Sequence, residues 1–568
     1  MESPGSVESS STDLAPLEPH GVPLHVCLRG FGRHFASSSA TVDTSTTAQV
    51  RPVSSYDHFL SHDWGTPRWM KVLSLMIVFN APAAFWTTLL LSIILGMLQA
   101  FEILPEGMWV AIIPHLSFLL LLCFWQRVRA LLLGPKNVFL DILCIPQHND
   151  KLKTRGIMGL GNNLERAKEL TVIWSPRYFT RLWCTYEIAM FLRRPERSRK
   201  IKLVPVTMPV ILCLFSAAWL CVRLQLTVVE AATAGWDDSG LRLLVKLGLM
   251  LLLNPVIFVM QSYLGMGLVQ DLEKLPKQLQ EFSIADSQCS CCFFQHRHPR
   301  TGKRIMCDRE VVYQAVSDAY DDQEVRRTIS SISHEISGST SGLDVFNGAV
   351  RSQLSNGISE QRLSSSLIPL DLFIYMVWAW DIPWLAPRLH LISQVGNLGR
   401  NPEYEHYDDL LRFFYALAEM IDWAKGLPSI LVLLFVSMQL WKLMSRWKCC
   451  PRIVRALASA SMVILSTLVV FLIIFLALDL TEDDWNPLNA LPFTFFLLLA
   501  ICFSKPPKAK LSSFFWSIVQ PGQQGSSPKP SPSEAHSWSE QLGKLDESTE
   551  EPSSTSKDVH VADDFFSV

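Results

Sequence analysis

Long stretches of apolar residues recur along this chain of 568 residues, and they constrain its fold more than any other feature of the sequence. A helix of about 20 apolar residues is long enough to cross the hydrocarbon core of a bilayer. Hydrophobic residues make up 49 % of the chain, which is high for a soluble protein. The sequence therefore predicts a multi-pass integral membrane protein with the lipid bilayer as a partner. The apolar segments lie at residues 72–100, 108–133, 209–229, 243–269, 428–444, 453–478 and 488–503.

The charged residues between these segments predict how the chain is oriented. Lysine and arginine favour the cytoplasmic side of a membrane, and they gather at residues 446–452 and 505–510. Acidic residues at 236–238 and 481–485 favour the opposite side. We therefore expect both termini, and the segment 270–365, to be cytoplasmic.

This orientation requires one further crossing, the eighth, between the fourth and fifth apolar segments, and residues 369–385 are the remaining candidate. Two carboxylates, Asp371 and Asp381, lie within this segment, and each costs about 3 kcal/mol near the centre of a bilayer. The segment could instead be an amphipathic helix that lies in the membrane interface, or its carboxylates could line a polar path through the membrane. If residues 369–385 cross the membrane, residues 386–427 form an external connection within a helical membrane region 367–504.

A second pattern, typical of an α/β domain, occupies the chain on both sides of the first two apolar segments. Short apolar runs that end in polar turns lie at residues 56–63, 137–147 and 170–176, and a fourth strand-like run lies at 201–206. Apolar residues at helical spacing follow the third run. The sequence therefore predicts a sheet built from residues 54–66 and 135–206 and divided by a membrane hairpin at 72–133. A second hairpin is predicted at 207–269, and no fifth strand can be found.

These runs resemble the motifs of a Toll/interleukin-1 receptor (TIR) domain. Asp57-His-Phe-Leu-Ser-His62 matches D-x-F-L-S-H, an F-L-D strand leads into a polar loop, and a strand ending in S-P-x-Y precedes Trp183-Cys-Thr-Tyr-Glu-Ile188. The resemblance implies a flavodoxin-like α/β fold and a cytoplasmic signalling module that acts by self-association. The hairpin at 72–133 departs from the family pattern and puts the family's first helix in doubt.

The resemblance also implies a candidate active site at the carboxyl ends of the strands. In the enzymatic members of the family, a glutamate on the W-C-x-x-E helix cleaves NAD+, and by motif position that residue is Glu187. Release of nicotinamide leaves positive charge on the ribose, which a nearby carboxylate stabilises as in glycoside hydrolysis. We expect the substrate-binding residues Ser61, Gln147, Ser175 and Trp183 around the same crevice.

A purely structural role for the same residues remains open. Many members of the family act by self-association alone, and Glu187 would then be a solvated or salt-bridged residue of its helix. Trp183 would be a core residue, and Ser175 would be a turn residue bonded to the backbone. Asp141, on the second strand, is predicted to orient the following loop rather than to react.

Cysteine and histidine residues gather in the cytoplasmic segment 270–365. Cys289 and Cys292 form a C-x-x-C pair, and four ligands of this kind can hold a zinc ion. The candidate zinc ligands are Cys289, Cys292, His296, His298 and Cys307. S-acylation of Cys291 and Cys292, beside two phenylalanines, is an alternative, and unmodified thiols are the other.

Both ends of the chain are predicted to be disordered, because residues 1–50 and 505–568 contain few large apolar side chains that could bury surface. The formal net charge of −2 gives no indication of a nucleic-acid partner. The predicted function is that of a multi-pass membrane protein with a TIR-like signalling module, with NAD+ hydrolysis as a candidate activity. A channel or transporter with a regulatory α/β domain, and a membrane scaffold without activity, are the alternatives.

Overall fold

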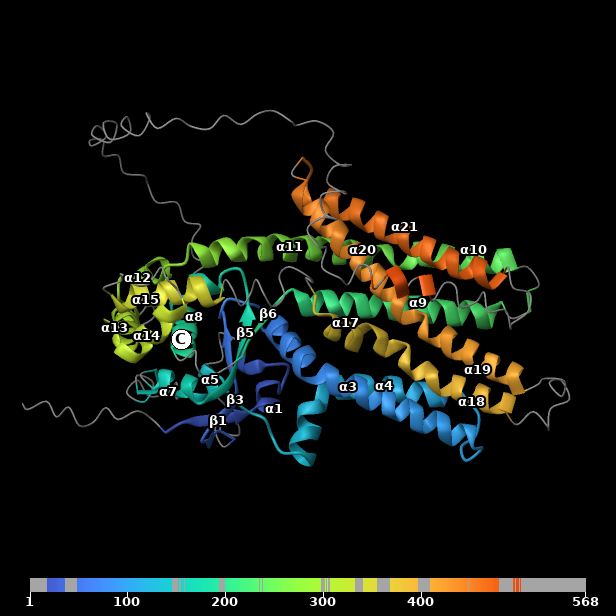
Figure 1. Ribbon diagram of the computed structural model, residues 1–568, viewed down its shortest axis with the longest axis horizontal. Coiled ribbons are helices and arrows are strands. Elements are labelled where there is room, and N and C mark those ends of the chain that lie inside the picture. Colours follow the sequence, from blue (N-terminus) through green and yellow to red (C-terminus); the bar gives the residue numbers. More distant parts are fainter. Residues whose placement is uncertain are drawn as a thin grey trace, which may run out of the picture.

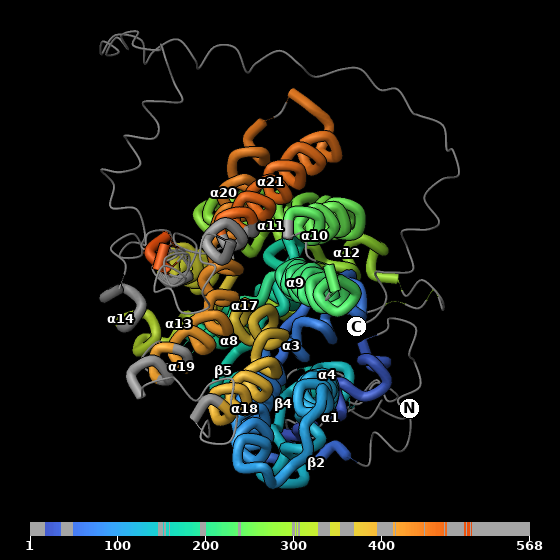
Figure 2. Tube along the Cα trace, turned by 90° about the vertical axis from the view of Figure 1, so that its right-hand side faces the viewer, coloured from blue at the N-terminus to red at the C-terminus, as the bar shows by residue number. Residues whose placement is uncertain are grey.

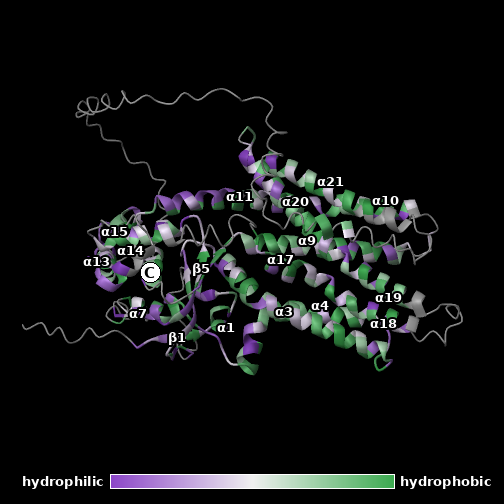
Figure 3. Ribbon diagram, viewed as in Figure 1, coloured by the Kyte–Doolittle hydropathy of each residue, from purple (hydrophilic) through white to green (hydrophobic). Residues whose placement is uncertain are grey.

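The structure, a computed structural model, has a sheet at one end of a long bundle of helices (Figure 1). Apolar residues dominate the bundle, whereas polar residues are concentrated around the sheet and the helices beside it (Figure 3). The structure describes residues 18–501, apart from 36–48, 146–151, 153–154, 158, 194–199, 234, 237–238, 298–301, 303, 305–306, 333–340, 355–367, 397–408, 448, 480–493, 496 and 500. The predicted combination of an α/β region with apolar helices is therefore present.

The sheet contains six strands in the spatial order β2-β1-β4-β3-β5-β6. Their bounds are β1 (His20–Pro23), β2 (Arg51–Pro52), β3 (Tyr56–His62), β4 (Asn137–Phe139), β5 (Ala167–Trp174) and β6 (Lys200–Pro205). Strands β4, β3, β5 and β6 are parallel, whereas β1 is antiparallel to both of its neighbours. Numbered by their order in the chain, the four parallel strands lie across the sheet in the order second, first, third, fourth. The four predicted strands are thus present, and no fifth parallel strand occurs among the described residues.

The N-terminal part of the chain adds the antiparallel edge, which corrects the prediction that residues 1–50 are disordered. Within that segment, residues 20–27 form β1 and the short helix α1 (Leu24–Cys27). Val22, Leu24 and Val26 are completely buried in the core beside β4. This local apolar run buries enough surface to hold the chain in place, although the segment as a whole is poor in large apolar residues.

Helix α3 (Arg68–Ala100) belongs to both parts of the molecule. Near its start, Val72 and Leu75 pack in the same core as Leu60 of β3. Farther along, the helix packs against α4 (Trp109–Leu132) and other helices of the bundle. The hairpin put the first helix of the α/β domain in doubt, and in the structure the first turns of α3 pack against the sheet. A helix of 33 residues is about 50 Å long, so its first turns cover the sheet while the remainder extends through the bundle.

Five helices of the described chain are long and apolar enough to cross a membrane, or six if a pair bent by 49° counts as one span. Figure 2 shows this bundle from one end. The spans are α3, α4, α9 (Met208–Ala232), α20 (Gly426–Arg446) with the last part of α19 (Asp409–Ala424), and α21 (Arg452–Asp479). The bent pair consists of α10 (Ser239–Leu253) and α11 (Pro255–Gln280). The prediction of several membrane helices is confirmed, and most of the predicted span 488–503 lies outside the described residues.

The predicted crossing at residues 369–385 is wrong as a single helix. Helix α17 (Leu370–Val377) has eight residues, and two 3-10 turns separate it from α18 (Leu385–Gly396). Eight helical residues rise about 12 Å, whereas the hydrocarbon core of a bilayer is about 30 Å thick.

The predicted external connection 386–427 contains helices α18 and α19, which occupy most of its described part. Helix α18 packs along α3 and against α19. The two backbones approach closely at Gly96 of α3, where an added Cβ atom would lie 2.8 Å from the Cα atom of Ala386. Apolar and small residues therefore draw this segment into the bundle.

A group of short helices, here called the helical cap, covers the side of the α/β domain near α8 (Leu182–Leu192) (Figure 1). The cap comprises the described residues of 282–354. Its helices are α12 (Ser290–Phe293), α13 (Asp308–Asp321), α14 (Gln323–Ile332) and α15 (Gly342–Ala349), followed by the turn η5 (Val350–Leu354). Helix α13 packs against α8, and the hydroxyl of Tyr320 donates a 2.7 Å hydrogen bond to the carbonyl of Ala189. Helix α11 leads from the bundle into this cap.

Candidate functional site

Polar side chains meet at the carboxyl ends of β3 and β5, where helix α8 begins. Ser61 is the sixth residue of β3, and its hydroxyl donates a hydrogen bond to the carboxyl of Glu187. The Tyr178 hydroxyl lies 2.5 Å from the Ser61 oxygen and is completely buried. Two of the predicted site residues, Ser61 and Glu187, are therefore in direct contact.

The environment of Glu187 is closed. The residue is 7 % exposed. Another part of the same helix packs against the helical cap. Burial raises the pKa of Glu187 to about 8, and the negative charge of Asp141 adds to this, while the hydrogen bond from Ser61 lowers it. At pH 7 a group with this pKa is protonated in roughly nine molecules of ten. In this arrangement, Glu187 is mostly a neutral acid rather than a carboxylate.

Asp63, immediately after β3, organises the neighbouring polar contacts. It is 1 % exposed and accepts a 3.1 Å hydrogen bond from the hydroxyl of Ser175. Arg177 donates to the same carboxylate oxygen at 3.1 Å, and Arg181 lies 3.9 Å from the other oxygen. Asp63 is the last residue of the first apolar run, 56–63, and no role was predicted for it. Its position directly after a buried strand is the feature of the sequence that could have indicated a role.

Asp141 has the structural role predicted for it. Its side chain accepts hydrogen bonds from the indole of Trp64 at 3.1 Å and from the backbone of Ile142 at 2.8 Å. Burial raises the pKa of Asp141, although these hydrogen bonds and the nearby Lys71 oppose the shift. Lys71 is completely buried and donates to the carbonyl of Trp64 at 3.1 Å. These bonds connect the turn after β3, the segment after β4 and helix α3.

The other predicted substrate-binding residues lie apart from the Ser61–Glu187 contact. Ser175 bonds to Asp63, and Trp183 reaches toward the helical cap, where its indole donates a 3.4 Å hydrogen bond to Asp308. Gln147 lies outside the described residues. The predicted crevice lined by all of these residues is therefore not formed by the described part of the chain.

The helical cap is joined to the start of α8 by backbone hydrogen bonds. The amide of Gln288 donates to the carbonyl of Thr180 at 2.6 Å, and the amide of Leu182 donates to the carbonyl of Gln288 at 3.2 Å. The Ser287 and Thr185 hydroxyls lie 3.4 Å apart. A cavity of about 470 Å³ lies elsewhere and is lined by His25, Arg29 and residues of α4. Backbone and side-chain contacts thus hold the cap against the start of α8.

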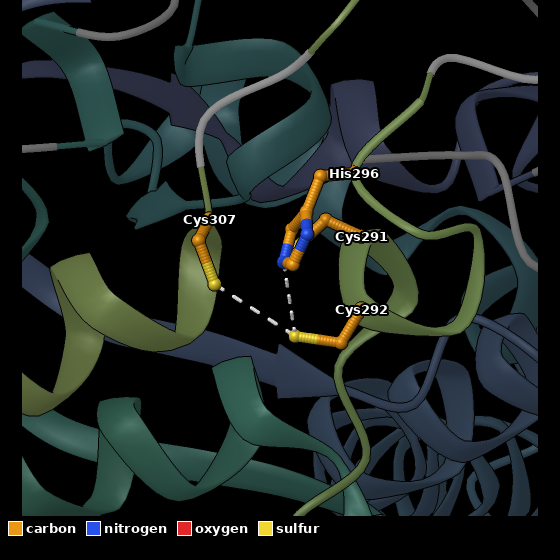
Figure 4. A group of neighbouring side chains, drawn as sticks. All are labelled: Cys291, Cys292, His296 and Cys307. Atoms are coloured by element: carbon orange, nitrogen blue, oxygen red, sulfur yellow. Dashed lines mark hydrogen bonds between the residues drawn. The ribbon is translucent and has the colours of Figure 1, made fainter.

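The cap contains a cluster of four metal-ligating side chains, Cys291, Cys292, His296 and Cys307 (Figure 4). Their ligand atoms all lie within 4.8 Å of one another. Such a cluster can hold a metal ion such as zinc. The predicted ligands Cys292, His296 and Cys307 are thus brought together, and His298 lies outside the described residues.

The predicted C-x-x-C pair used Cys289, whereas the group of four contains Cys291, a residue of α12. Cys289 lies directly behind it, with its sulfur 3.0 Å from the sulfur of Cys291.

A second polar cluster lies within the helical bundle. Asp381, at the break after α17, is 2 % exposed and forms a 3.0 Å ion pair with Arg223 of α9. The indole of Trp219 donates to the same carboxylate at 2.9 Å, and the indole of Trp423 donates to the Asp381 carbonyl at 2.8 Å. This ion pair explains how the carboxylate of Asp381, which was predicted to lie within a membrane span, is stabilised in the bundle.

Comparisons with protein-family models, with curated proteins and with solved structures found no match.

Proposed function

We propose that this protein is a membrane-embedded signalling protein, in which a cytoplasmic TIR-like module self-associates in response to changes in the helical bundle. Helix α3 is the observation that carries this proposal. Its first turns form part of the core of the sheet, and the same unbroken helix continues through the bundle. Strand β6 also leads almost directly into α9, because only two residues separate the two elements. A displacement within the bundle therefore moves the base of the sheet.

The test combines self-association with this coupling. The full chain, labelled with one fluorophore and reconstituted in lipid vesicles, is expected to show more than one copy per assembly by stepwise photobleaching. One alanine inserted after Phe79 rotates the remainder of α3 by about 100° relative to the sheet. This insertion should weaken self-association, whereas an alanine inserted after Leu104, in the turn between α3 and α4, should not. Monomers at every density would contradict self-association, and equal behaviour of the two insertions would contradict coupling through α3.

Cleavage of NAD+ at Glu187 is the candidate activity of the same module. The contact between Glu187 and Ser61 at the carboxyl ends of the strands supports it, since ligands of open α/β sheets bind there. Reaction would require the cap to open, so that the carboxyl loses its proton and meets substrate. The assay is nicotinamide release from NAD+ at high protein density. Glu187→Gln should lower the rate roughly a hundredfold to a thousandfold. If the wild type shows no turnover, or both proteins turn over equally, self-association alone remains.

The ion pair in the bundle favours a second candidate function, a channel or transporter regulated by the α/β module. Ionisable side chains within membrane segments commonly mark ion or substrate pathways, and Asp381 and Arg223 form such a pair. Flux of ions or small solutes into proteoliposomes tests this candidate, with Asp381→Asn expected to change the flux. Absence of flux in the wild type would leave the pair as a structural element of a signalling protein or scaffold.

A further inference from the structure

We propose that Cys291, Cys292, His296 and Cys307 form a tetrahedral zinc site that fastens the helical cap onto helix α8. The proposal concerns the organisation of the cap and stands whether or not the α/β module signals. Three observations carry it: the spacing of the ligand atoms, the backbone that holds them, and the position of the cluster between two contacts to α8.

Two distances between ligand atoms match those of a zinc site. In tetrahedral zinc centres, bonds of about 2.3 Å to sulfur and about 2.0 Å to nitrogen separate two sulfurs by roughly 3.8 Å and a sulfur from a nitrogen by roughly 3.6 Å. Here the sulfurs of Cys292 and Cys307 are 3.7 Å apart. The sulfur of Cys292 lies 3.6 Å from Nε2 of His296. Both distances are edges of such a tetrahedron, and Figure 4 shows these side chains converging on one point.

The backbone around the cluster is shaped to bring the ligands together. Gln295 and His296 both have positive φ angles, of 51° and 57°, although neither is a glycine. This region is unfavourable for residues other than glycine, and ligand binding at His296 would offset that cost. Beyond them, Arg297 and Arg304 form an antiparallel bridge that returns the chain to Cys307. Ligands on either side of a tight turn and hairpin are typical of structural zinc sites.

Hydrogen-bonding groups lie beside the ligand sulfurs. The backbone amide of Asp308 donates to the sulfur of Cys291 at 3.2 Å. Cys307 immediately precedes α13, a helix of 14 residues. The sulfur of Cys289 lies 3.0 Å from the sulfur of Cys291, which is within hydrogen-bond distance. Cys289 is therefore assigned to support a ligand rather than to bind zinc.

The cluster lies between the two places where the cap contacts the start of α8. On one side, Gln288 pairs with Thr180 and Leu182. On the other side, Asp308 accepts the hydrogen bond from Trp183. An ion bound to the cluster would link these two segments of the cap at one point. It would thereby hold the cap closed over the helix that carries Glu187.

Zinc content of the full chain tests the site directly. Protein purified in detergent with a reductant and with zinc supplied should contain about one zinc per chain by mass spectrometry. Cys292→Ser and Cys307→Ser should retain about a tenth or less of that zinc after mild chelation, since a ligand is lost. His296→Cys should retain it, because three or four cysteines also serve as ligands. Cys450→Ser, at an exposed cysteine away from the cluster, is the matched control.

Two further variants and one structural measurement complete the test. Cys289→Ser should keep zinc and Cys291→Ser should lose it. The reverse result would overturn the assigned ligand set. Hydrogen exchange in residues 282–296 and in α13 should become faster when zinc is removed, while β3 and β5 stay unchanged. Unchanged exchange would overturn the fastening role. A wild type without zinc, or a disulfide between Cys292 and Cys307 in protein alkylated before cell lysis, would overturn the site itself.

Discussion

The buried carboxyl of Glu187 predicts a specific dependence of stability on pH. Its ordinary pKa is 4.5, and burial raises the pKa to about 8 in the folded protein. Between these two values, the folded state keeps a proton that the unfolded chain has already released. The contribution of Glu187 to the free energy of unfolding is therefore fully present at low pH, and it falls as the pH rises from 4.5 toward 8.

The magnitude follows from the width of that interval. One pH unit across this interval is worth about 1.4 kcal/mol, so the raised pKa of Glu187 lowers the stability of the folded domain by about 3 kcal/mol at pH 7, about 4 kcal/mol at pH 8 and about 5 kcal/mol at higher pH. Glu187→Gln preserves the shape of the side chain and its capacity to accept the hydrogen bond from Ser61, but it cannot ionise. We expect the variant to resemble the wild type near pH 5 and to be more stable than the wild type at pH 8.

Hydrogen exchange of peptides from β3 and α8, corrected for the intrinsic dependence on pH, reports this difference within the α/β domain. Protection in the wild type should decline between pH 5 and pH 8, whereas protection in Glu187→Gln should stay nearly constant. Glu310→Gln, at an exposed carboxylate of α13, is the matched control and should follow the wild type. Parallel pH profiles for the wild type and Glu187→Gln would refute the assignment of a buried neutral acid at this position.

Two other substitutions test contacts of the fold. Asp63→Asn removes a buried charge that faces Arg181, and it should destabilise the α/β domain by about 3 kcal/mol, measured as faster hydrogen exchange in β3 and β5. Gly265→Ala should destabilise the bundle by about 1–3 kcal/mol, because the added carbon would lie 2.2 Å from the buried ring of Trp441. Gly248→Ala, where nothing lies within 4 Å, should leave the melting temperature in nanodiscs unchanged or raise it, and equal effects of the two glycine variants would contradict the close packing.

The local patterns of the sequence predicted the elements whose residues interact with near neighbours. The strands β3, β4, β5 and β6 lie where short apolar runs end in polar turns, and the membrane helices lie where apolar residues are continuous. The contact between Ser61 and Glu187 follows from the same logic, since Ser61 lies near the carboxyl end of β3 and Glu187 lies in the helix that follows the adjacent parallel strand β5.

Elements that depend on distant partners could not be predicted in this way. Strand β1 is stable because it pairs with β4, more than a hundred residues later in the chain. The break at Asp381 is stable because Arg223 and Trp219, from another helix, satisfy the carboxylate. Neither partnership leaves a periodic signal in the sequence, because the contacts form between residues that are far apart along the chain.

The sequence by itself determined which kinds of element this protein contains: an α/β pattern, apolar helices of membrane length, and a local group of cysteine and histidine residues. These follow from residue type and short-range spacing, which the unfolded chain already contains. Tertiary structure decided that α3 serves both the sheet and the bundle, that the helical cap covers α8, and that Cys291 rather than Cys289 completes the cluster. Those outcomes depend on the orientation of whole elements, and packing of their buried side chains sets that orientation only when the chain has folded.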